Sequence, residues 1–331
     1  MSADVLLHAD NVVKHFGSAR RGPLVRAVDG VSLTVHRGET VGLVGETGCG
    51  KSTLARCLTR LYELSSGTVR FAGRDISQLS RRQLAPVRRD LQMIFQDPYG
   101  SLNPRRRVGS IIGDPFAIHG VADGPERRRR VQDLMRLVGL NPEHYNRYPS
   151  EFSGGQRQRI GVARAVALHP QLVVCDEPVS ALDVSIQAQV INLLDDLQHE
   201  LGLAYLFISH DLSVVRHVSD RVAVMYLGQV VETAPARQLY DHPRHPYTAA
   251  LLSAAPVADP DLADRRERIL ITGDVPSPVA PPSGCRFHPR CPKAQHRCTA
   301  EAPALLARDP ADAAHLTACH FPVGDLSELV P

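Results

Sequence analysis

The chain lacks any segment that would place it inside a membrane. No apolar run approaches the 18 or more residues that a helix needs to cross a bilayer. The first residues, MSAD, do not show the basic and then apolar pattern of a secretory signal peptide. We therefore expect a protein that stays in the cytosol or is held at a membrane by a partner.

A strong charge imbalance is also missing. The net charge is +3 over 331 residues, which argues neither for nor against binding to nucleic acid. Arginines cluster at residues 81–82, 105–107 and 127–130. Solvated helix faces are the favoured interpretation of these clusters, and contact with acidic partners or lipid headgroups is the alternative. No sustained heptad repeat indicates a coiled coil.

One glycine-rich stretch matches G-x-x-x-x-G-K-[ST], the pattern of a phosphate-binding loop. An apolar run at residues 40–44 predicts a buried strand before it, and Leu54, Leu58 and Leu61 follow at helical spacing. The glycines allow backbone N–H groups to surround a phosphate chain, and the start of the helix attracts the same anion. Lys51 is expected to reach the terminal phosphates, and Ser52 to bind Mg²⁺. The stretch consists of Gly45, Glu46, Thr47, Gly48, Cys49, Gly50, Lys51, Ser52 and Thr53.

A second apolar strand, at residues 172–176, ends in two carboxylates. In phosphate-loop ATPases the aspartate at this strand end holds Mg²⁺ through water, so Asp176 is the candidate here. Glu177 is the candidate general base for the attacking water. Gln96 follows another strand and is a candidate for binding Mg²⁺ or water near a phosphate.

A second predicted helix start has anion-binding character. Ser153 is a good N-cap, and Gly154 and Gly155 leave the backbone N–H groups of the first turn unobstructed. Gln156 completes this segment, which carries no lysine and would complement the first loop. His210 follows the strand at residues 204–208, where it would contact a terminal phosphate or have a structural role. Phe16 would stack on adenine or pack in the core.

Four of the seven cysteines lie in the last fifth of the chain, after a stiff proline-rich segment at residues 274–282. Their spacing, C-x₅-C-x₆-C-x₂₀-C, matches neither a zinc ribbon nor a standard ferredoxin. In a reducing compartment the clustering suggests a metal site more than disulfides. Zn²⁺, a [4Fe–4S] cluster and four free thiols stay open from the residues alone. The four are Cys285, Cys291, Cys298 and Cys319.

Taken in order, these motifs resemble the nucleotide-binding subunits of ABC transporters. Residues 45–53 match the Walker A motif, Gln96 the Q-loop, residues 153–156 the signature and residues 172–177 Walker B. Residues 180–183 match the D-loop, which adds Asp183 to the nucleotide-binding residues, and His210 matches the switch histidine. Phe16 falls where the family places its adenine-stacking aromatic residue. The resemblance implies an ABC-type P-loop ATPase of α/β class with a RecA-like core, an antiparallel β subdomain and an α-helical subdomain.

Two further segments, at residues 95–104 and 242–252, narrow the resemblance to the F-type ATPases of dipeptide, oligopeptide and nickel importers. It implies an ATPase core at residues 1–96 and 153–235, a helical subdomain at 97–152 and an extension at 236–331. Some peptide-importer ATPases with this tail bind a [4Fe–4S] cluster, which favours that group over Zn²⁺. Regulation of transport by such a group is a further hypothesis.

The resemblance also implies how the subunit would work. ATP and Mg²⁺ would be held between Walker A of one ATPase and the signature of a second, related ATPase. The pair would sit at the cytoplasmic face of the membrane under two permease subunits, with an extracytoplasmic binding protein delivering peptide and no nucleic acid involved. Nickel or glutathione import, and a non-transport ABC ATPase, are the alternatives. The permease and binding protein would determine the substrate specificity, so the sequence of this chain does not identify the substrate.

Overall fold

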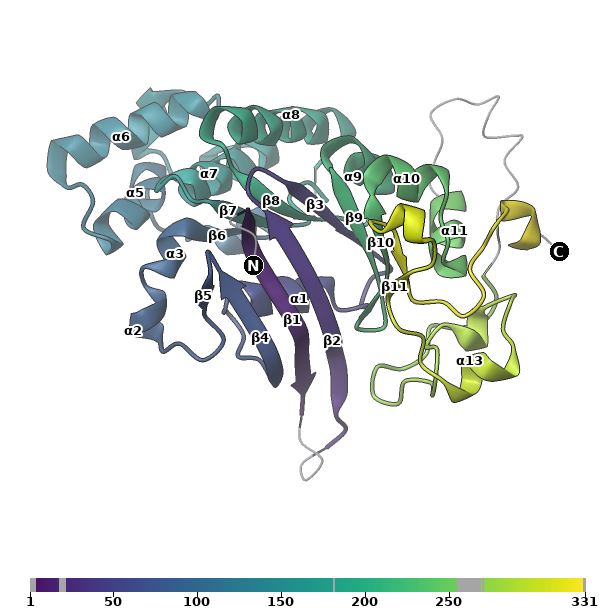
Figure 1. Cartoon of the computed structure of the whole chain (residues 1–331). Coiled ribbons are helices and arrows are strands. Elements are labelled where there is room, and N and C mark those ends of the chain that lie inside the picture. Colours follow the sequence, from purple (N-terminus) through teal and green to yellow (C-terminus); the bar gives the residue numbers. More distant parts are fainter. Residues whose placement is uncertain (1–3, 18–21, 181, 255–268, 270, 330–331) are drawn as a thin grey trace. The chain divides into compact units, whose positions relative to one another are not determined.

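The computed structural model describes residues 4–17, 22–180, 182–254, 269 and 271–329 (Figure 1). The chain divides into two compact units. Unit 1 contains residues 1–7, 35–39 and 71–208, and unit 2 contains residues 8–34, 40–70 and 209–331. Both units combine parallel strands with helices, as the predicted α/β class requires. The boundaries predicted for the core, the helical subdomain and the extension stay a prediction.

Unit 1 is built on three parallel strands in the order β6-β7-β8. Every residue of β7 and β8 is buried, which explains why both segments are continuous apolar runs in the sequence. Because parallel strands end at the same edge of a sheet, the residues after β6 and β7 are brought together there. The bounds are β6 (Leu91–Ile94), β7 (Leu172–Asp176) and β8 (Ala204–Ile208).

Helices form most of the rest of unit 1, including the segment predicted to be helical. The apolar stripe of α6 is buried at Val131, Leu134 and Met135, whereas Arg129 and Arg136 are exposed. A short strand, β5 (Arg74–Asp75), precedes the helices. These are α2 (Arg81–Leu84), α3 (Val87–Asp90), α4 (Pro98–Ser101), α5 (Val108–Ile118), α6 (Gly124–Leu137), η1 (Pro142–Asn146), η2 (Pro149–Glu151), α7 (Gly154–Val166) and α8 (Val184–Leu201).

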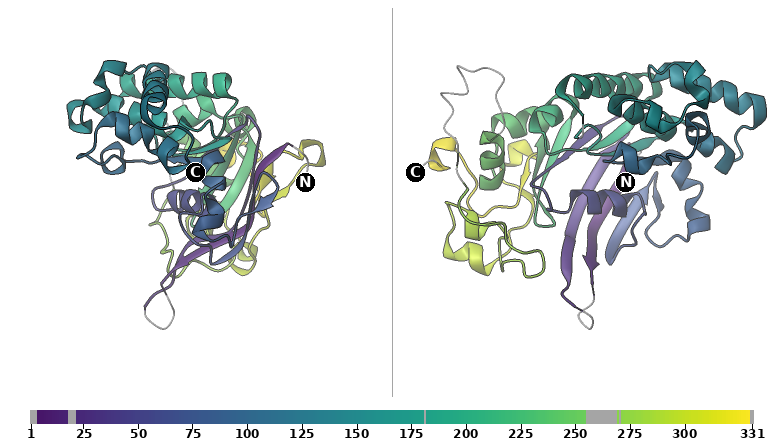
Figure 2. Two further views of the ribbon diagram at one scale, coloured as in Figure 1. Left: turned by 90° about the vertical axis from the view of Figure 1, so that its left-hand side faces the viewer. Right: turned by 180° about the vertical axis from the view of Figure 1, so that it is seen from behind.

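Unit 2 contains most of a strand group in the order β2-β1-β4 and a second group in the order β11-β12-β10-β9-β3. β1 and β2 lie side by side with opposite directions in Figures 1 and 2, as the predicted antiparallel β subdomain requires. β3 pairs with β9 in parallel, and β9 pairs with β10 antiparallel. The bounds are β1 (Val5–Phe16), β2 (Val25–His36), β3 (Thr40–Val44), β4 (Ser66–Phe71), β9 (Arg221–Tyr226) and β10 (Gln229–Pro235).

The helix after the glycine-rich loop, α1 (Lys51–Leu58), is shorter than its apolar spacing predicted. Arg60 has a left-handed φ of 54°, which ends the helical path before Leu61. Leu61 is 46% exposed, whereas Leu54 and Leu58 are buried. The periodicity therefore predicted the first two turns correctly and was wrong at its third leucine.

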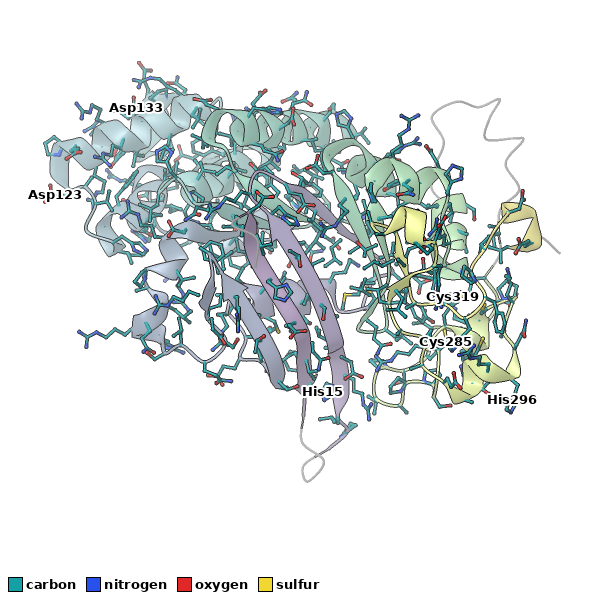
Figure 3. The ribbon with its side chains drawn as sticks, in the orientation of Figure 1. His15, Asp123, Asp133, Cys285, His296 and Cys319 are labelled. Carbon is teal, nitrogen blue, oxygen red and sulfur yellow. The ribbon has the colours of Figure 1, made fainter. Side chains whose placement is uncertain are left out.

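In the C-terminal part of unit 2, Val323 and Leu329 pack with Ala249 and Ala250 of α11 (Pro246–Ser253) in one apolar cluster. Figure 3 places Cys285 and Cys319 within this part, and His296 at the outer side of α13. In the described parts of the chain, no helix has the length and apolar character to cross a bilayer. The other elements are α9 (Leu212–Val218), α10 (Ala236–Asp241), η3 (His288–Arg290), α13 (His296–Ala300), β11 (Leu306–Ala307), η4 (Pro310–Asp312), β12 (Leu316–Thr317) and η5 (Leu326–Leu329).

Candidate functional site

The glycine-rich loop of unit 2 requires glycine at its two ends. Gly45 and Gly50 have φ angles of +152° and +108°. A Cβ atom at Gly45 would lie 2.1 Å from the carbonyl oxygen of Met225, and one at Gly50 would lie 2.1 Å from that of Ala27. Both contacts are with backbone atoms that cannot move aside. The loop is thus pressed against β9 and β2, and its path is fixed by its neighbours.

Lys51 lies inside this loop rather than in solvent. Its side chain is buried, and Nζ donates to the carbonyl oxygens of Gly45 at 2.7 Å and Glu46 at 3.0 Å. Ser52 and Thr53 follow in the first turn of α1, whose N-cap is Gly50 without a side-chain cap. The start of α1 and the ammonium group together form a positive concavity suited to an anion.

Phe16 and His210 are both at the surface of unit 2. Phe16 is 36% exposed, so it is not a core residue, and Tyr62 contacts it edge-on with the ring centroids 5.6 Å apart. The Lys14 ammonium group lies 5.0 Å from the Phe16 centroid. His210 is exposed and lies before α9, which Asp211 caps by accepting from two backbone N–H groups. Binding of ATP by Phe16 and His210 stays a prediction.

Unit 1 brings two of the predicted catalytic residues into contact. Nε2 of Gln96 donates to Oε2 of Glu177 at 2.9 Å. Glu177 has a left-handed φ of 48°, and its backbone N–H donates to the carbonyl oxygen of Ile208 at 3.0 Å. The neighbouring Asp176 ends β7 and is 1% exposed. The ends of β6 and β7 therefore position a glutamine, an aspartate and a glutamate at one edge.

The predicted signature forms the start of α7. Ser153 Oγ accepts from the backbone N–H of Gln156, and the Gln156 side chain accepts from the backbone N–H of Ser153. This reciprocal capping box fixes the first turn of α7, in which Gly154 is half-buried and Gly155 is buried. A Cβ at Gly155 would lie 2.4 Å from Cγ2 of Ile186 on α8, so only glycine permits this approach. Asp183 occupies the N-cap position of α8, and Ala181 lies outside the described residues.

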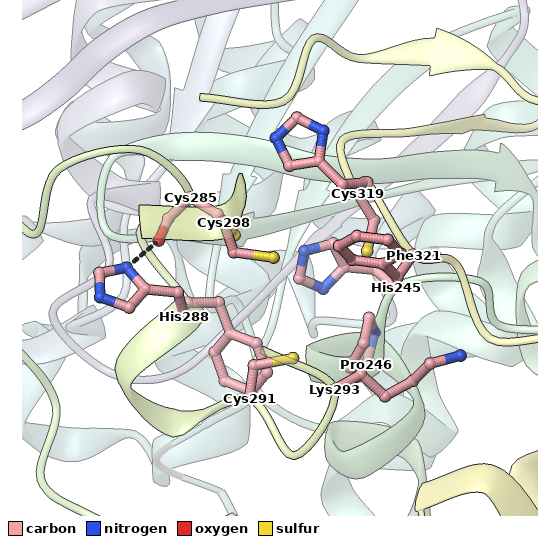
Figure 4. A pocket seen from close by; sticks show the side chains of 11 residues that line it. His245, Pro246, Cys285, His288, Cys291, Lys293, Cys298, Cys319 and Phe321 are labelled. Atoms are coloured by element: carbon pink, nitrogen blue, oxygen red, sulfur yellow. Dashed lines mark hydrogen bonds between the residues drawn. The ribbon is translucent and has the colours of Figure 1, made fainter. Parts of the chain in front are cut away.

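All four predicted cysteines of the tail line one cavity (Figure 4). Its other walls include the rings of Phe287, Phe321 and His245. The space free of atoms, counting the part that opens to solvent, is about 300 Å³. Burial raises the pKa of the Cys291 thiol to about 11 and that of Cys319 to about 12, and it raises the pKa of Cys285. These three thiols therefore stay protonated at neutral pH unless a cation replaces the protons.

Histidines near this cavity differ in what they can contribute. His288 and His320 line it, but each has a ring nitrogen bonded to a backbone carbonyl oxygen, of Cys285 and Glu301 respectively. His296 is exposed. Over the described ranges, no group of three or more His, Cys, Asp or Glu side chains is placed to hold a metal ion. The thiols thus share a cavity without forming the compact ligand set of a single ion.

The tail also bonds directly to the glycine-rich loop, which sequence reasoning missed. Arg290, the residue before Cys291, holds the Glu46 carboxylate with nitrogen–oxygen distances of 3.0 to 3.3 Å. The Glu46 backbone N–H donates to the Tyr247 hydroxyl at 2.9 Å. The sequence signal was present, because Glu46 is a carboxylate inside a phosphate-binding loop and needs a cation nearby.

A buried hydrogen-bonded pair of side chains beside α11 was also missed. Glu232 and His315 have no exposed surface, and Nε2 of His315 lies 2.6 Å from Oε1 of Glu232. The two carboxylate oxygens accept from the backbone N–H groups of Arg244 and His245, at 2.7 and 3.0 Å. A glutamate at an inward-facing position of β10 was the only sequence signal. This carboxylate fixes the turn that leads into α11.

Comparisons with known proteins agree on one family. Residues 28–180 match the ABC transporter family, and residues 231–298 match the family "Oligopeptide/dipeptide transporter, C-terminal region". The chain is 55% identical over 298 residues to the oligopeptide transport ATP-binding protein AppF of Bacillus subtilis, covering 90% of each chain. It is 50% identical to the di/tripeptide transport ATP-binding protein DppF of Pseudomonas aeruginosa, covering 96% of this chain and 98% of that one.

A solved structure extends the likeness to three dimensions. An ATP-binding cassette in a dimeric, post-hydrolysis state with ADP and Pi aligns with a TM-score of 0.64 at 28% identity, over 70% of this chain and 99% of that one. The fold, the nucleotide-binding motifs and the tail thus all indicate the same family. The chain belongs to the ABC transporter ATP-binding subunits of the oligopeptide and dipeptide type.

Proposed function

We propose that this chain hydrolyses ATP to energise the import of di- or oligopeptides. The observation that carries the proposal is the identity of 50 to 55%, over 90% or more of the chain, to proteins named as oligopeptide or di/tripeptide transport ATP-binding proteins. A second, related ATPase subunit and two permeases would complete the transporter at the cytoplasmic face of the membrane. An extracytoplasmic binding protein would deliver the peptide.

The residues of the chain support a division of labour in hydrolysis. Lys51 would bind the terminal phosphates, and Ser52, Gln96 and Asp176 would hold Mg²⁺, Asp176 through water. Glu177 would accept a proton from the attacking water while the bond between the γ-phosphorus and the β–γ bridging oxygen breaks and ADP leaves. The start of α7, with the Ser153 hydroxyl and the backbone N–H groups of its first turn, would close the site of a second ATPase subunit rather than that of its own chain.

Replacing Lys51 by alanine tests the proposal at the phosphate site. A hydrogen bond to a charged group contributes about 1.5–3 kcal/mol, so we expect ATP to bind about 10- to 100-fold more weakly. Fluorescence titration of the assembled complex with a labelled nucleotide measures the loss. Arg147→Ala, at an exposed position in unit 1, is the control and should leave the affinity unchanged.

The same variant tests the transported substrate in cells. Cells that carry only Lys51→Ala should lose uptake of labelled di- and tripeptides. If peptide uptake continues while nickel or glutathione uptake is lost, an alternative substrate replaces peptides. If no uptake changes although ATP binding is lost, the transport function is excluded.

We also propose that the four cysteines hold a [4Fe–4S] cluster. Four thiols on one cavity, shielded by Phe287 and Phe321, provide the ligand number and the apolar surroundings that such a cluster requires. In a zinc site all four sulfurs surround a single ion at about 2.3 Å, whereas in a cluster each binds a different iron. When bound, the group would supply electron transfer or a structural crosslink.

Replacing Cys291 by serine should abolish the cluster. We expect anaerobically reconstituted wild-type protein to contain about four iron and four sulfide per chain with a broad visible absorbance, and Cys291→Ser to lose most of both. Cys57→Ser, a buried thiol of α1 outside the cavity, is the matched control and should keep them. Zinc without sulfide in wild-type protein would refute the cluster.

A further inference from the structure

His245 forms part of the wall of the cysteine cavity and is held there from two sides. Its backbone N–H donates to Oε2 of Glu232 at 3.0 Å. Its ring nitrogen Nδ1 accepts from the backbone N–H of Tyr247 at 3.1 Å, so the side chain caps α11. The residue is 1% exposed, and its ring is tilted against Phe287 with the centroids 5.7 Å apart. The ring is therefore fixed in position and orientation.

The bond at Nδ1 determines where the ring carries its proton. A nitrogen that accepts a hydrogen bond has no hydrogen, and a neutral imidazole then carries its single proton on the other nitrogen, Nε2. Nε2–H is thus a fixed donor. It is buried and has no partner among the residues that the structure describes.

A buried donor without an acceptor costs about 1–3 kcal/mol, so an acceptor is expected at this position. The cavity wall offers few. Pro246, Phe287 and Phe321 are apolar where they line it. Nζ of Lys293 is itself a donor and is already bonded to the carbonyl oxygen of Pro322 and to Glu328. The remaining wall consists mainly of the four cysteines, whose sulfurs become acceptors once they are deprotonated (Figure 4).

We propose that Nε2–H of His245 donates a hydrogen bond to a sulfur of the group that the four cysteines hold. This inference rests on the cluster proposed above. Such a bond is stronger to the reduced, more negatively charged cluster, because hydrogen bonds to charge are the stronger ones. His245 is therefore a positioning residue that raises the reduction potential of the cluster, as hydrogen bonds to cluster sulfurs do in general.

Two substitutions separate the two roles of the ring. In His245→Asn, the amide oxygen can replace Nδ1 as the acceptor that caps α11, but no donor reaches the position of Nε2. In His245→Gln, the amide nitrogen can reach the position of Nε2, but the cap is lost. The measurement is the midpoint potential of the reconstituted full chain, in which one electron from a mediator reduces the oxidised cluster. Thermal unfolding of both variants reports the state of the cap.

We expect His245→Asn to lower the ratio of reduced to oxidised cluster about tenfold at a fixed potential. For a one-electron couple this corresponds to a midpoint potential lower by about 59 mV. His245→Gln should stay near wild type in potential while it lowers the unfolding temperature. Equal potentials in all three proteins overturn the proposal, and Nε2–H then faces the ring of Phe287. If wild-type protein forms no cluster, the cluster proposal fails and this inference fails with it.

A measurement on wild-type protein keeps the test independent of whether the variants fold. Electron–nuclear double resonance of the reduced cluster should show a strongly coupled proton that exchanges with deuterium, together with a weak nitrogen coupling. Absence of both signals from a cluster with full iron content contradicts a bond from His245.

Discussion

Replacing Glu177 by glutamine is expected to slow ATP hydrolysis by about 10²- to 10⁴-fold in the assembled complex, the usual contribution of a general base. Glutamine has nearly the same shape, and its amide oxygen can still accept from Nε2 of Gln96, as Oε2 of Glu177 does at 2.9 Å. The variant therefore keeps the contact and loses only the ability to take a proton. Phosphate release measured at saturating ATP gives the rate.

The affinity for ATP separates this explanation from a damaged site. We expect Glu177→Gln to bind ATP at least as tightly as wild type, so that ATP-bound complex accumulates. Glu143→Gln, at an exposed position of η1, is the control for removing one carboxylate from unit 1. A Glu177→Gln variant that hydrolyses ATP at the wild-type rate would remove Glu177 from its proposed role.

Replacing Glu232 by alanine should have the largest effect on stability. The change removes the acceptor of two backbone N–H groups and of His315, which like Glu232 and His245 has almost no exposed surface. Each buried group left without its hydrogen-bond partner costs about 1–3 kcal/mol, so we expect a loss of several kcal/mol in the free energy of unfolding. Urea denaturation followed by circular dichroism measures it.

Two further variants test the cause of this loss. Glu232→Gln keeps the size and one acceptor oxygen, so its loss should lie between those of wild type and Glu232→Ala. Glu301 pairs with Arg297 on the surface, and Glu301→Ala should leave the urea midpoint unchanged. An equal response of the Glu232 and Glu301 variants would show that the buried carboxylate does not stabilise the fold.

The sequence predicted those parts of the site that are formed by residues close together in the chain. The strand before Gly45, the N-cap at Ser153, and the buried strand that ends at Asp176 all follow from local spacing. Even the contact between Gln96 and Glu177 could be expected, because both follow strands of one parallel sheet. The end of α1 could not be predicted, because nothing in the local sequence indicates the left-handed backbone conformation of Arg60.

The contacts missed from the sequence join residues far apart in the chain. Glu232 and His315 are separated by 83 positions, and Glu46 and Arg290 by 244. Periodicity carries no information at these separations, since each partner is an ordinary charged residue in its own segment. His245 was within a recognised segment, yet its role depends on cysteines that begin 40 positions later.

The bonds from Tyr247 and Arg290 to Glu46 bear on how this protein can be divided. The cassette and the tail match two separate family models. An experimenter could therefore choose to prepare the cassette alone as a shortened fragment. A fragment ending at residue 235 would leave the second residue of the phosphate-binding loop without either partner. Nucleotide affinities measured on such a fragment would describe a different loop from the one in the full-length chain.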